Sequence, residues 1–289
     1  MVESAQPIRW NKIGIIMGGG ALPIRLAETC ASRGDPFVAI RLDGYADKGA
    51  QAFEGIDIKF AEAGKLLRFL KEKECDAVTF AGLVPRPDFS KMNLDWRAAA
   101  LLPRLIRAAT RGDGELLKAI VDAFEAEGFK VIGADEIAGD LSAQRGPLGA
   151  VVPKDEDRAD IKKAARLIAA LGPYDVGQAA VVSQGLVLAI EAAEGTDAML
   201  DRCAALPPAL KGDAAQPRGV LVKRPKPGQE LRIDLPTIGT KTIEKASRAG
   251  LAGIAIEAGH ALVMGTDEVR AKANDAGIFI YGFTPEELE

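Results

Sequence analysis

Apolar and amphipathic segments alternate along the first half of the chain. An apolar run at residues 13–17 is followed by three glycines and by a helical pattern at residues 21–33. The alternation continues with strands expected at 36–42, 76–81 and 129–133 and helices at 62–73, 97–110 and 114–127. Strands that alternate with helices of this length form mostly parallel sheets with helices on both faces. The pattern therefore predicts a Rossmann-like α/β domain.

The pattern lapses between residues 141 and 152, where Gly146-Pro147 is the strongest break. We place a domain boundary there, which gives an N-terminal domain of residues 1–145 and a C-terminal domain of residues 146–289. Beyond the break, helices are expected at 156–170, after 196, at 240–248 and after 266, and strands at 179–182, 186–190, 219–222, 231–234, 253–257, 261–264 and 278–281. The second domain is therefore also α/β, and most of the candidate chemistry lies in it.

The composition fits a soluble globular protein with a substantial core. The chain has 289 residues, 48% of them hydrophobic, and a net charge of -4. That charge argues against a general nucleic-acid binder, because neutralising phosphates requires a concentrated basic surface. No apolar run reaches the roughly 18 residues of a membrane span, and the first residues lack the pattern of a signal peptide. We therefore expect a cytoplasmic location.

Cysteine and histidine are too sparse for several kinds of metal site. Cys30, Cys75 and Cys203 lie far apart, and His260 is the only histidine in the sequence. A disulfide framework, a structural zinc site and a histidine-rich dinuclear centre are therefore not expected. A bound metal would need oxygen ligands, which favours Mg²⁺, with Mn²⁺ as a substitute.

An acidic cluster follows an apolar run in the second half. Glu191, Glu194 and Asp197 come directly after the expected strand, and ligands of α/β proteins bind at strand ends. Thr196 also fits a helix cap with Asp197 in the first turn, which is a purely structural role. That alternative leaves Glu191 and Glu194 unexplained.

A basic segment follows a later strand. Lys223, Arg224 and Lys226 alternate with prolines, which hold the cations in an extended conformation. Fixed cations suit a pyrophosphate group, although a solvated charged loop has the same composition. Asp234 follows in a strand-like segment between Ile233 and Leu235, where it either pairs with a cation or binds a metal.

Two further features have both a functional and a structural interpretation. The turn Gly18-Gly19-Gly20 precedes a helix, whose start attracts anions, but it lacks the spacing of a dinucleotide or P-loop motif and also fits a simple tight turn. The helix at 97–110 is basic and amphipathic, with cations at Arg97, Arg104, Arg107 and Arg111 and apolar residues at Leu101, Leu102, Leu105 and Ile106. Such a helix suits either a membrane surface or a solvated outer face.

Six motifs together resemble one enzyme family. They are Gly18-Gly-Gly-Ala-Leu-Pro23, Asp175-Val-Gly-Gln178, Glu191-Ala-Ala-Glu-Gly-Thr-Asp-Ala-Met199, Lys223-Arg-Pro-Lys-Pro-Gly-Gln229, Asp234-Leu-Pro-Thr-Ile-Gly239 and Gly253-Ile-Ala-Ile-Glu-Ala-Gly259. The chain resembles, from about Lys12 to Gly282, the two-domain α/β family of UDP-2,3-diacylglucosamine pyrophosphatases of lipid A synthesis, which lacks the metallophosphoesterase histidines. Met17 stands where a smaller residue is expected, and Arg224 lies at a variable position of the basic loop, which affects local packing alone.

The resemblance implies magnesium-dependent hydrolysis of an acylated UDP-sugar to UMP and 2,3-diacylglucosamine 1-phosphate. With the residue chemistry, it assigns three groups of residues. Catalysis is expected from Asp234, Lys223 and Glu194. Metal binding is expected from Asp234, Glu191 and Asp197. Substrate binding is expected from Gly18, Gly19, Gly20, Gln178, Thr196, Lys226 and Thr237.

Other functions stay open at this point. A nucleotide-sugar transferase would also use a metal and acids, and a non-catalytic lipid- or nucleotide-binding protein would leave the substrate intact. The expected partners are the acylated UDP-sugar and, peripherally, the inner face of the cytoplasmic membrane. A homodimer is a further expectation, and no nucleic acid is expected.

Overall fold

The computed structural model describes residues 10–84 and 96–289, without the side chains of 96–101. The chain folds into two compact units, Met1–Gly139 and Asp140–Glu289. This division lies a few residues before the boundary expected after residue 145. Across the described residues, no helix combines the length and apolar character needed to cross a membrane.

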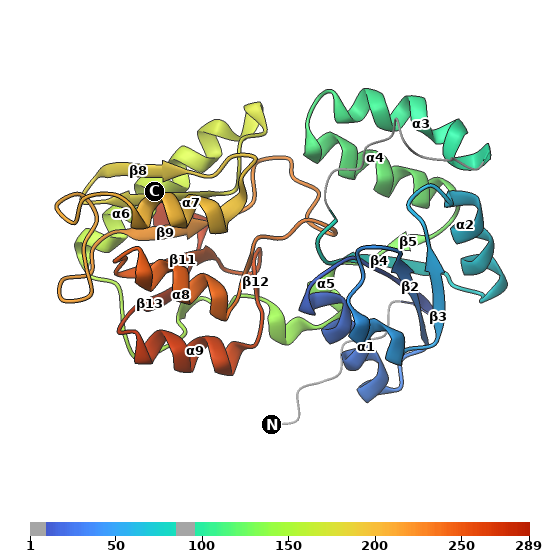
Figure 1. Cartoon of the computed structure of the whole chain (residues 1–289), viewed down its shortest axis with the longest axis horizontal. Coiled ribbons are helices and arrows are strands. Elements are labelled where there is room, and N and C mark those ends of the chain that lie inside the picture. The colour runs from blue at the N-terminus through green and yellow to red at the C-terminus, as the bar shows by residue number, and fades with distance from the viewer. Residues whose placement is uncertain (1–9, 85–95) are drawn as a thin grey trace. The chain divides into compact units, whose positions relative to one another are not determined.

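The N-terminal unit contains one fully parallel sheet (Figure 1). Its strand order is β3-β2-β1-β4-β5, which is a Rossmann-like order. The strands are β1 (Ile13–Met17), β2 (Phe37–Leu42), β3 (Gly55–Ile58), β4 (Ala77–Ala81) and β5 (Lys130–Val131). The helices are α1 (Ala21–Arg33), α2 (Ala63–Glu72), α3 (Trp96–Ala109), α4 (Asp113–Ala126) and α5 (Ala134–Ile137). The predicted fold of this half is confirmed.

Helices cover both faces of this sheet. Helix α1 packs with α5, whereas α3 packs with α2 and α4, and the two groups lie on opposite sides (Figure 1). Strand β1 is buried along its whole length, which explains its continuous apolar run. Helix α2 buries Leu66, Leu67 and Leu70 and exposes Lys65 and Arg68. The alternation of apolar strands and amphipathic helices in the sequence therefore follows from this layering.

The C-terminal unit contains a mixed sheet of six strands in the order β6-β13-β11-β9-β7-β8. The strands are β6 (Gly146–Pro147), β7 (Ala179–Ser183), β8 (Leu186–Ile190), β9 (Val220–Lys223), β11 (Gly253–Glu257) and β13 (Phe279–Phe283). Strands β13, β11 and β9 are parallel to one another, and β6, β7 and β8 pair antiparallel with their neighbours. A separate parallel pair joins β10 (Thr237–Ile238) to β12 (Leu262–Val263).

Alternate residues of these strands enter two hydrophobic clusters. Along β11, Ile254 and Ile256 belong to one cluster and Ala255 to the other. The cluster on one face includes residues of α7 (Gly195–Ala204), α8 (Thr240–Arg248) and α9 (Thr266–Asp275). The cluster on the other face includes residues of α6 (Asp155–Leu171) (Figure 1). The predicted α/β class is therefore also confirmed for the second unit.

One predicted strand is wrong. Residues 231–234 form turns, in which the N–H groups of Ile233 and Asp234 donate to the carbonyl of Glu230 (3.3 and 3.1 Å). The guanidinium of Arg232 folds back onto the Glu230 carboxylate (Nε–Oε1 2.8 Å). These local hydrogen bonds take the place of bonds to a neighbouring strand. The alternating polar and apolar pattern of the sequence does not reveal such local bonds.

Candidate active site

Three strands of the C-terminal sheet meet at the same end of the sheet, where β8 and β9 end and β7 begins. Lys223 is the last residue of β9 and pairs with Ala179, the first residue of the antiparallel strand β7. Glu191 follows β8, and its N–H donates to the carbonyl of Ala179 (2.9 Å). Gln178 precedes β7. The strand register therefore brings together Lys223, Glu191 and Gln178, three of the residues proposed from the sequence.

Lys223 is a buried cation at this end of the sheet. Only 6% of the residue is exposed, and its Nζ donates to the backbone carbonyl of Thr237 (3.0 Å). Burial lowers the pKa of its ammonium group, and the negative charges of Glu191, Asp197 and Asp234 oppose this shift. No carboxylate in the described part of the chain forms an ion pair with Nζ. Donors of the ammonium group therefore remain for a ligand.

Glu191 is also buried, but both oxygens of its carboxylate accept hydrogen bonds from other residues of the protein. One oxygen, Oε2, accepts from the N–H of Gln178 (3.0 Å), and the other, Oε1, accepts from Oγ1 of Thr196 (2.6 Å). Thr196 lies inside the first turn of α7, which begins at Gly195, and does not cap that helix. Glu191 therefore ties the end of β8 to the starts of β7 and α7, close to Lys223.

Gln229 joins the basic loop to Asp234. Its Oε1 accepts from the N–H of Lys226 (2.8 Å). Its Nε2 lies within hydrogen-bond distance of Oε1 of Gln178 (3.1 Å), the carbonyl of Asp234 (2.6 Å) and Oδ2 of Asp234 (2.8 Å). This amide therefore holds Asp234 against the segment that precedes β7.

Asp234 and Lys226 complete the cluster. Burial raises the pKa of the Asp234 carboxyl, the cation of Lys226 lowers it, and the carboxylate of Asp175 raises it. Lys226 forms an ion pair with Asp175, and its side chain is only 14% exposed. Asp175 has a left-handed backbone (φ 54°), a conformation that is unusual for a non-glycine residue. Two lysines and two aspartates thus lie together in a largely desolvated site.

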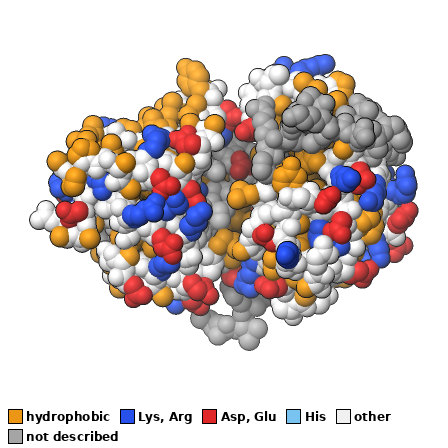
Figure 2. Space-filling view, in the orientation of Figure 1, with side chains coloured by type: hydrophobic (Ala, Val, Ile, Leu, Met, Phe, Trp, Pro, Cys, Tyr) orange, Lys and Arg blue, Asp and Glu red, His pale blue; other side chains and the backbone are white. Residues whose placement is uncertain are grey.

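The remaining acids of the predicted set point to other partners. Glu194 is exposed and pairs with Arg202 (2.5 Å). Asp197 is 44% exposed and pairs with Lys241 (2.6 Å). Figure 2 shows acidic and basic side chains mixed over the part of this unit that α7, α8 and α9 form. Neither acid bonds directly to Lys223 or Asp234 among the described contacts, although the charge of Asp197 acts on Lys223.

Both halves of the chain match the same family. The pattern of the LpxI N-terminal domain matches residues 12–141, and that of the LpxI C-terminal domain matches residues 144–281. The chain belongs to the LpxI family. It is 50% identical over 277 residues to a relative from Caulobacter vibrioides (strain ATCC 19089 / CIP 103742 / CB 15), named UDP-2,3-diacylglucosamine pyrophosphatase LpxI. The match covers 96% of this chain and 99% of the relative.

The triple glycine of this LpxI-family chain has a clear structural role. The N–H groups of Gly18 and Gly19 donate to the carbonyls of Ala81 and Leu83 (2.8 and 2.9 Å). A Cβ at Gly18 would lie 2.8 Å from the carbonyl oxygen of Leu83, so the close backbone approach requires glycine. The N–H of Gly20 donates to Oδ2 of Asp47 (2.7 Å). Protein acceptors therefore occupy these three N–H groups, and nucleotide or phosphate binding at this turn stays a prediction.

Asp175 and Gln229 are the members of the cluster that have no role assigned from the sequence. Both lie inside the motifs that carry the family resemblance, and this position is the feature of the sequence that points to them. Gln229 carries no charge, and Asp175 ends a short turn after Tyr174. Their contacts with Lys226 and Asp234 depend on how two distant loops fold, which residue spacing does not disclose.

A second buried ion pair lies beside the site of this LpxI-family unit. Nη2 of Arg224 lies 2.8 Å from Oε2 of Glu257, at an angle unlike that of a hydrogen bond. The N–H of Arg224 donates to the carbonyl of Gln178 (3.1 Å), and Nδ1 of His260 lies 3.0 Å from Oε1 of Glu257. Arg224 therefore anchors the basic loop to the end of β11.

Proposed function

We propose that this protein hydrolyses the pyrophosphate bond of UDP-2,3-diacylglucosamine and releases UMP and 2,3-diacylglucosamine 1-phosphate in lipid A biosynthesis. The observation that carries the proposal is a buried lysine with free donors, Lys223, in the same cluster as a half-buried aspartate, Asp234. The identity to the Caulobacter relative over nearly the whole chain supports the choice of substrate. It also supports the reaction class, hydrolysis of a phosphoric anhydride.

The two lysines account for binding and charge stabilisation. Lys223 and Lys226 present ammonium groups in a poorly solvated region, where a fixed cation stabilises phosphate oxygens more strongly than in water. Phosphoryl transfer depends mainly on such positioning and electrostatic stabilisation. The carbonyl of Thr237 accepts from Lys223, and Gln178 and Thr196 donate to Glu191. These three residues therefore lie in the hydrogen-bond network of the site and are suited to substrate binding.

Asp234 is the proposed general base that activates the attacking water. Burial raises its pKa, so its carboxylate is a stronger base than an ordinary aspartate. In the proposed step it accepts a proton as the water oxygen bonds to one phosphorus, and the bond from that phosphorus to the bridging oxygen breaks. The displaced phosphate group leaves with the bridging oxygen. His260 is bonded to Glu257 and is not needed in this step.

We propose a supporting role for Mg²⁺, with Mn²⁺ as a substitute. In the described part of the chain, no group of three or more His, Cys, Asp or Glu side chains is arranged to hold a metal. Mg²⁺ commonly keeps several of its waters and is held by substrate phosphates and one or two carboxylates; Asp234, whose Oδ1 has no protein donor among the described contacts, would hold it through a water and keep its role as base. When bound, the ion supplies charge neutralisation on the pyrophosphate oxygens. Asp197 and Glu191 fit direct ligation less well because they bond to protein donors.

Product analysis tests the proposal. The purified protein is incubated with UDP-2,3-diacylglucosamine and Mg²⁺, with a second sample containing a chelator, and both are followed by mass spectrometry. Equal, metal-dependent release of UMP and the acylated sugar 1-phosphate is expected. A glycosidic product without UMP would instead indicate a nucleotide-sugar transferase. Intact substrate that stays bound would indicate a binding protein.

Location and assembly follow from the proposed substrate. A sugar with two acyl chains resides at a membrane, so we propose that the protein works in the cytoplasm and contacts the inner face of the cytoplasmic membrane. The homodimer stays a prediction, and light scattering after size exclusion measures it. No nucleic-acid partner is proposed, because the net charge of -4 argues against one.

A further inference from the structure

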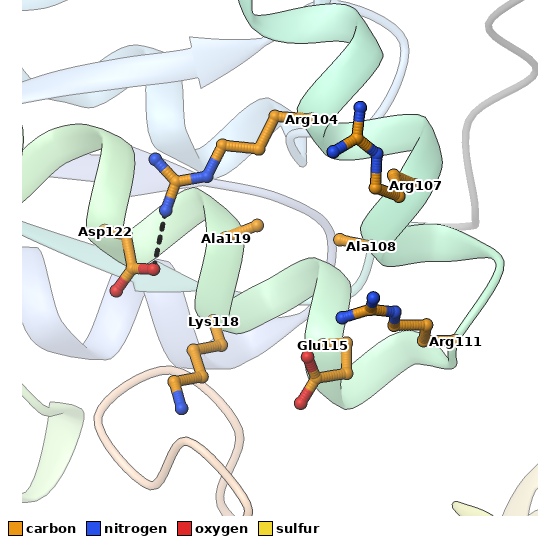
Figure 3. A pocket seen from close by; sticks show the side chains of 8 residues that line it. All are labelled: Arg104, Arg107, Ala108, Arg111, Glu115, Lys118, Ala119 and Asp122. Atoms are coloured by element: carbon orange, nitrogen blue, oxygen red, sulfur yellow. Dashed lines mark hydrogen bonds and ion pairs between the residues drawn. The ribbon is translucent and has the colours of Figure 1, made fainter.

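A shallow charged pocket lies between helices α3 and α4 of the N-terminal unit (Figure 3). Arg104 and Arg107 come from α3, Arg111 follows it, and Lys118 comes from α4. The small side chains of Ala108 and Ala119 line the pocket between the charged ones, together with Glu115 and Asp122. Four cations and two acids give this pocket a local positive excess, although the whole chain has a net charge of -4.

Most of these cations have no partner among the residues that the structure describes. Arg104 pairs with Asp122 (2.7 Å), which neutralises both groups. Arg107, Arg111 and Lys118 are exposed, and within the described residues none of them forms an ion pair or a side-chain hydrogen bond. Glu115 alone offsets them. A surface that keeps three unpaired cations around one hollow is suited to an anion, and arginine matches phosphate oxygens with paired donors.

The same helix also presents apolar surface. Ile106 is 44% exposed directly beside Arg107, and Leu102 and Leu105 are only partly buried. A helix with basic and apolar surface side by side binds where phosphate headgroups meet acyl chains. The side chains of Arg97 and Leu101, which belong to the predicted amphipathic pattern, lie outside the described residues. Nucleic acid fits this surface less well, because the patch is small and partly apolar.

We propose that the basic pocket formed by Arg107, Arg111 and Lys118 binds phosphate groups of anionic lipids and docks the N-terminal unit on the membrane surface. The proposal extends the proposed function only in explaining how the protein reaches an acylated substrate. Each cation near an anionic bilayer contributes about fivefold to binding. Removing two of them should therefore weaken vesicle binding by about 30-fold.

Vesicle sedimentation of the full chain tests this assignment. The wild-type protein is expected to bind vesicles that contain phosphatidylglycerol, to bind pure phosphatidylcholine poorly, and to dissociate as salt rises. The double variant Arg107→Gln/Arg111→Gln should lose most of this binding. The matched control Lys59→Gln/Arg68→Gln removes two exposed cations from another part of the same unit and should bind as the wild type does.

The possible outcomes separate docking from catalysis. Equal vesicle binding by the wild type and the Arg107→Gln/Arg111→Gln variant, or no binding by the wild type, overturns the docking proposal. Equal loss in the control variant also overturns it, because the effect would then reflect total charge. Hydrolysis of detergent-dispersed substrate is measured in parallel and should not change in either variant. Its absence in the wild type would overturn the proposed function and leave the docking result standing.

Discussion

Burial acts on Lys223 and Asp234 in opposite directions. It lowers the pKa of the lysine and raises the pKa of the aspartate, so each is shifted toward its neutral form. Groups that are desolvated in this way are unfavourable for stability but useful for catalysis, where a reactive base and an unpaired cation are needed. The two residues therefore account for much of the chemistry proposed for the C-terminal unit.

Replacing Asp234 with asparagine separates the effect of this carboxylate on catalysis from its effect on stability. The Asp234→Asn variant should lose at least about 100-fold in kcat, because a positioned general base contributes that much or more. Its free energy of unfolding should stay equal or rise by roughly 0.5–2 kcal/mol, because a partly desolvated carboxylate with a raised pKa destabilises the fold when it is ionised. Turnover and urea denaturation measure both quantities. Near-normal turnover would remove Asp234 from the mechanism.

The pH profile of the wild type gives a second test of Asp234. Because its folded-state pKa lies above the ordinary value of 3.8, the carboxylate is lost earlier as the pH falls. The acidic limb of kcat/KM should therefore lie above that of an ordinary aspartate, and circular dichroism should show intact protein over the same range. A limb at or below pH 3.8 would mean that ionisation of Asp234 does not limit the reaction.

The sequence draws attention to the charged residues of the candidate site more than to the neutral ones. Lys223, Lys226 and Asp234 stand out because charge combined with proline or with apolar neighbours is unusual in a core. Gln229 was not assigned a role, since a neutral amide between charged groups gives no signal until the loop is folded. Glu194 was assigned a catalytic role by its position after the strand, but the structure pairs its exposed side chain with Arg202.

At the scale of elements, the end of the C-terminal sheet determines the site. Antiparallel pairing of β7 with β9 sets Ala179 opposite Lys223, and β8 brings Glu191 to the same edge. The long, strongly periodic elements were predicted correctly. Strands β3, β6 and β10 were not predicted, because β3 is a partly exposed edge strand and the other two have two residues each.

The ion pair between Arg224 and Glu257 should stabilise the basic loop against β11. Both side chains are largely buried, with exposed fractions of 17% and 5%. The Glu257→Gln variant leaves the arginine without its charge partner and should destabilise the protein by about 3–5 kcal/mol. Chemical denaturation measures this change.

Glu244 supplies a matched control for that variant. Its ion pair with Lys272 is exposed, with side-chain exposed fractions of 56% and 38%, so Glu244→Gln should change stability by less than about 1 kcal/mol. Equal effects of the two substitutions would show that the pair between Arg224 and Glu257 is no stronger than a surface contact.

At the scale of the whole molecule, each unit contributes different chemistry. The C-terminal unit holds the lysines and aspartates of the candidate active site, and the N-terminal unit holds the basic pocket of α3 and α4. The family assignment covers both units, which agrees with the α/β architecture found in each. The proposed reaction uses a substrate with a pyrophosphate group and two acyl chains, so it needs both a charged site and access to lipid.

Phosphorus NMR of the reaction tests the central claim most directly. Wild-type protein with UDP-2,3-diacylglucosamine and Mg²⁺ should convert the two pyrophosphate resonances into two phosphomonoester resonances of equal area. The Asp234→Asn protein, prepared in the same way, should leave the pyrophosphate resonances nearly unchanged. Pyrophosphate resonances that persist with the folded wild-type protein would contradict the account, and so would equal conversion by both proteins.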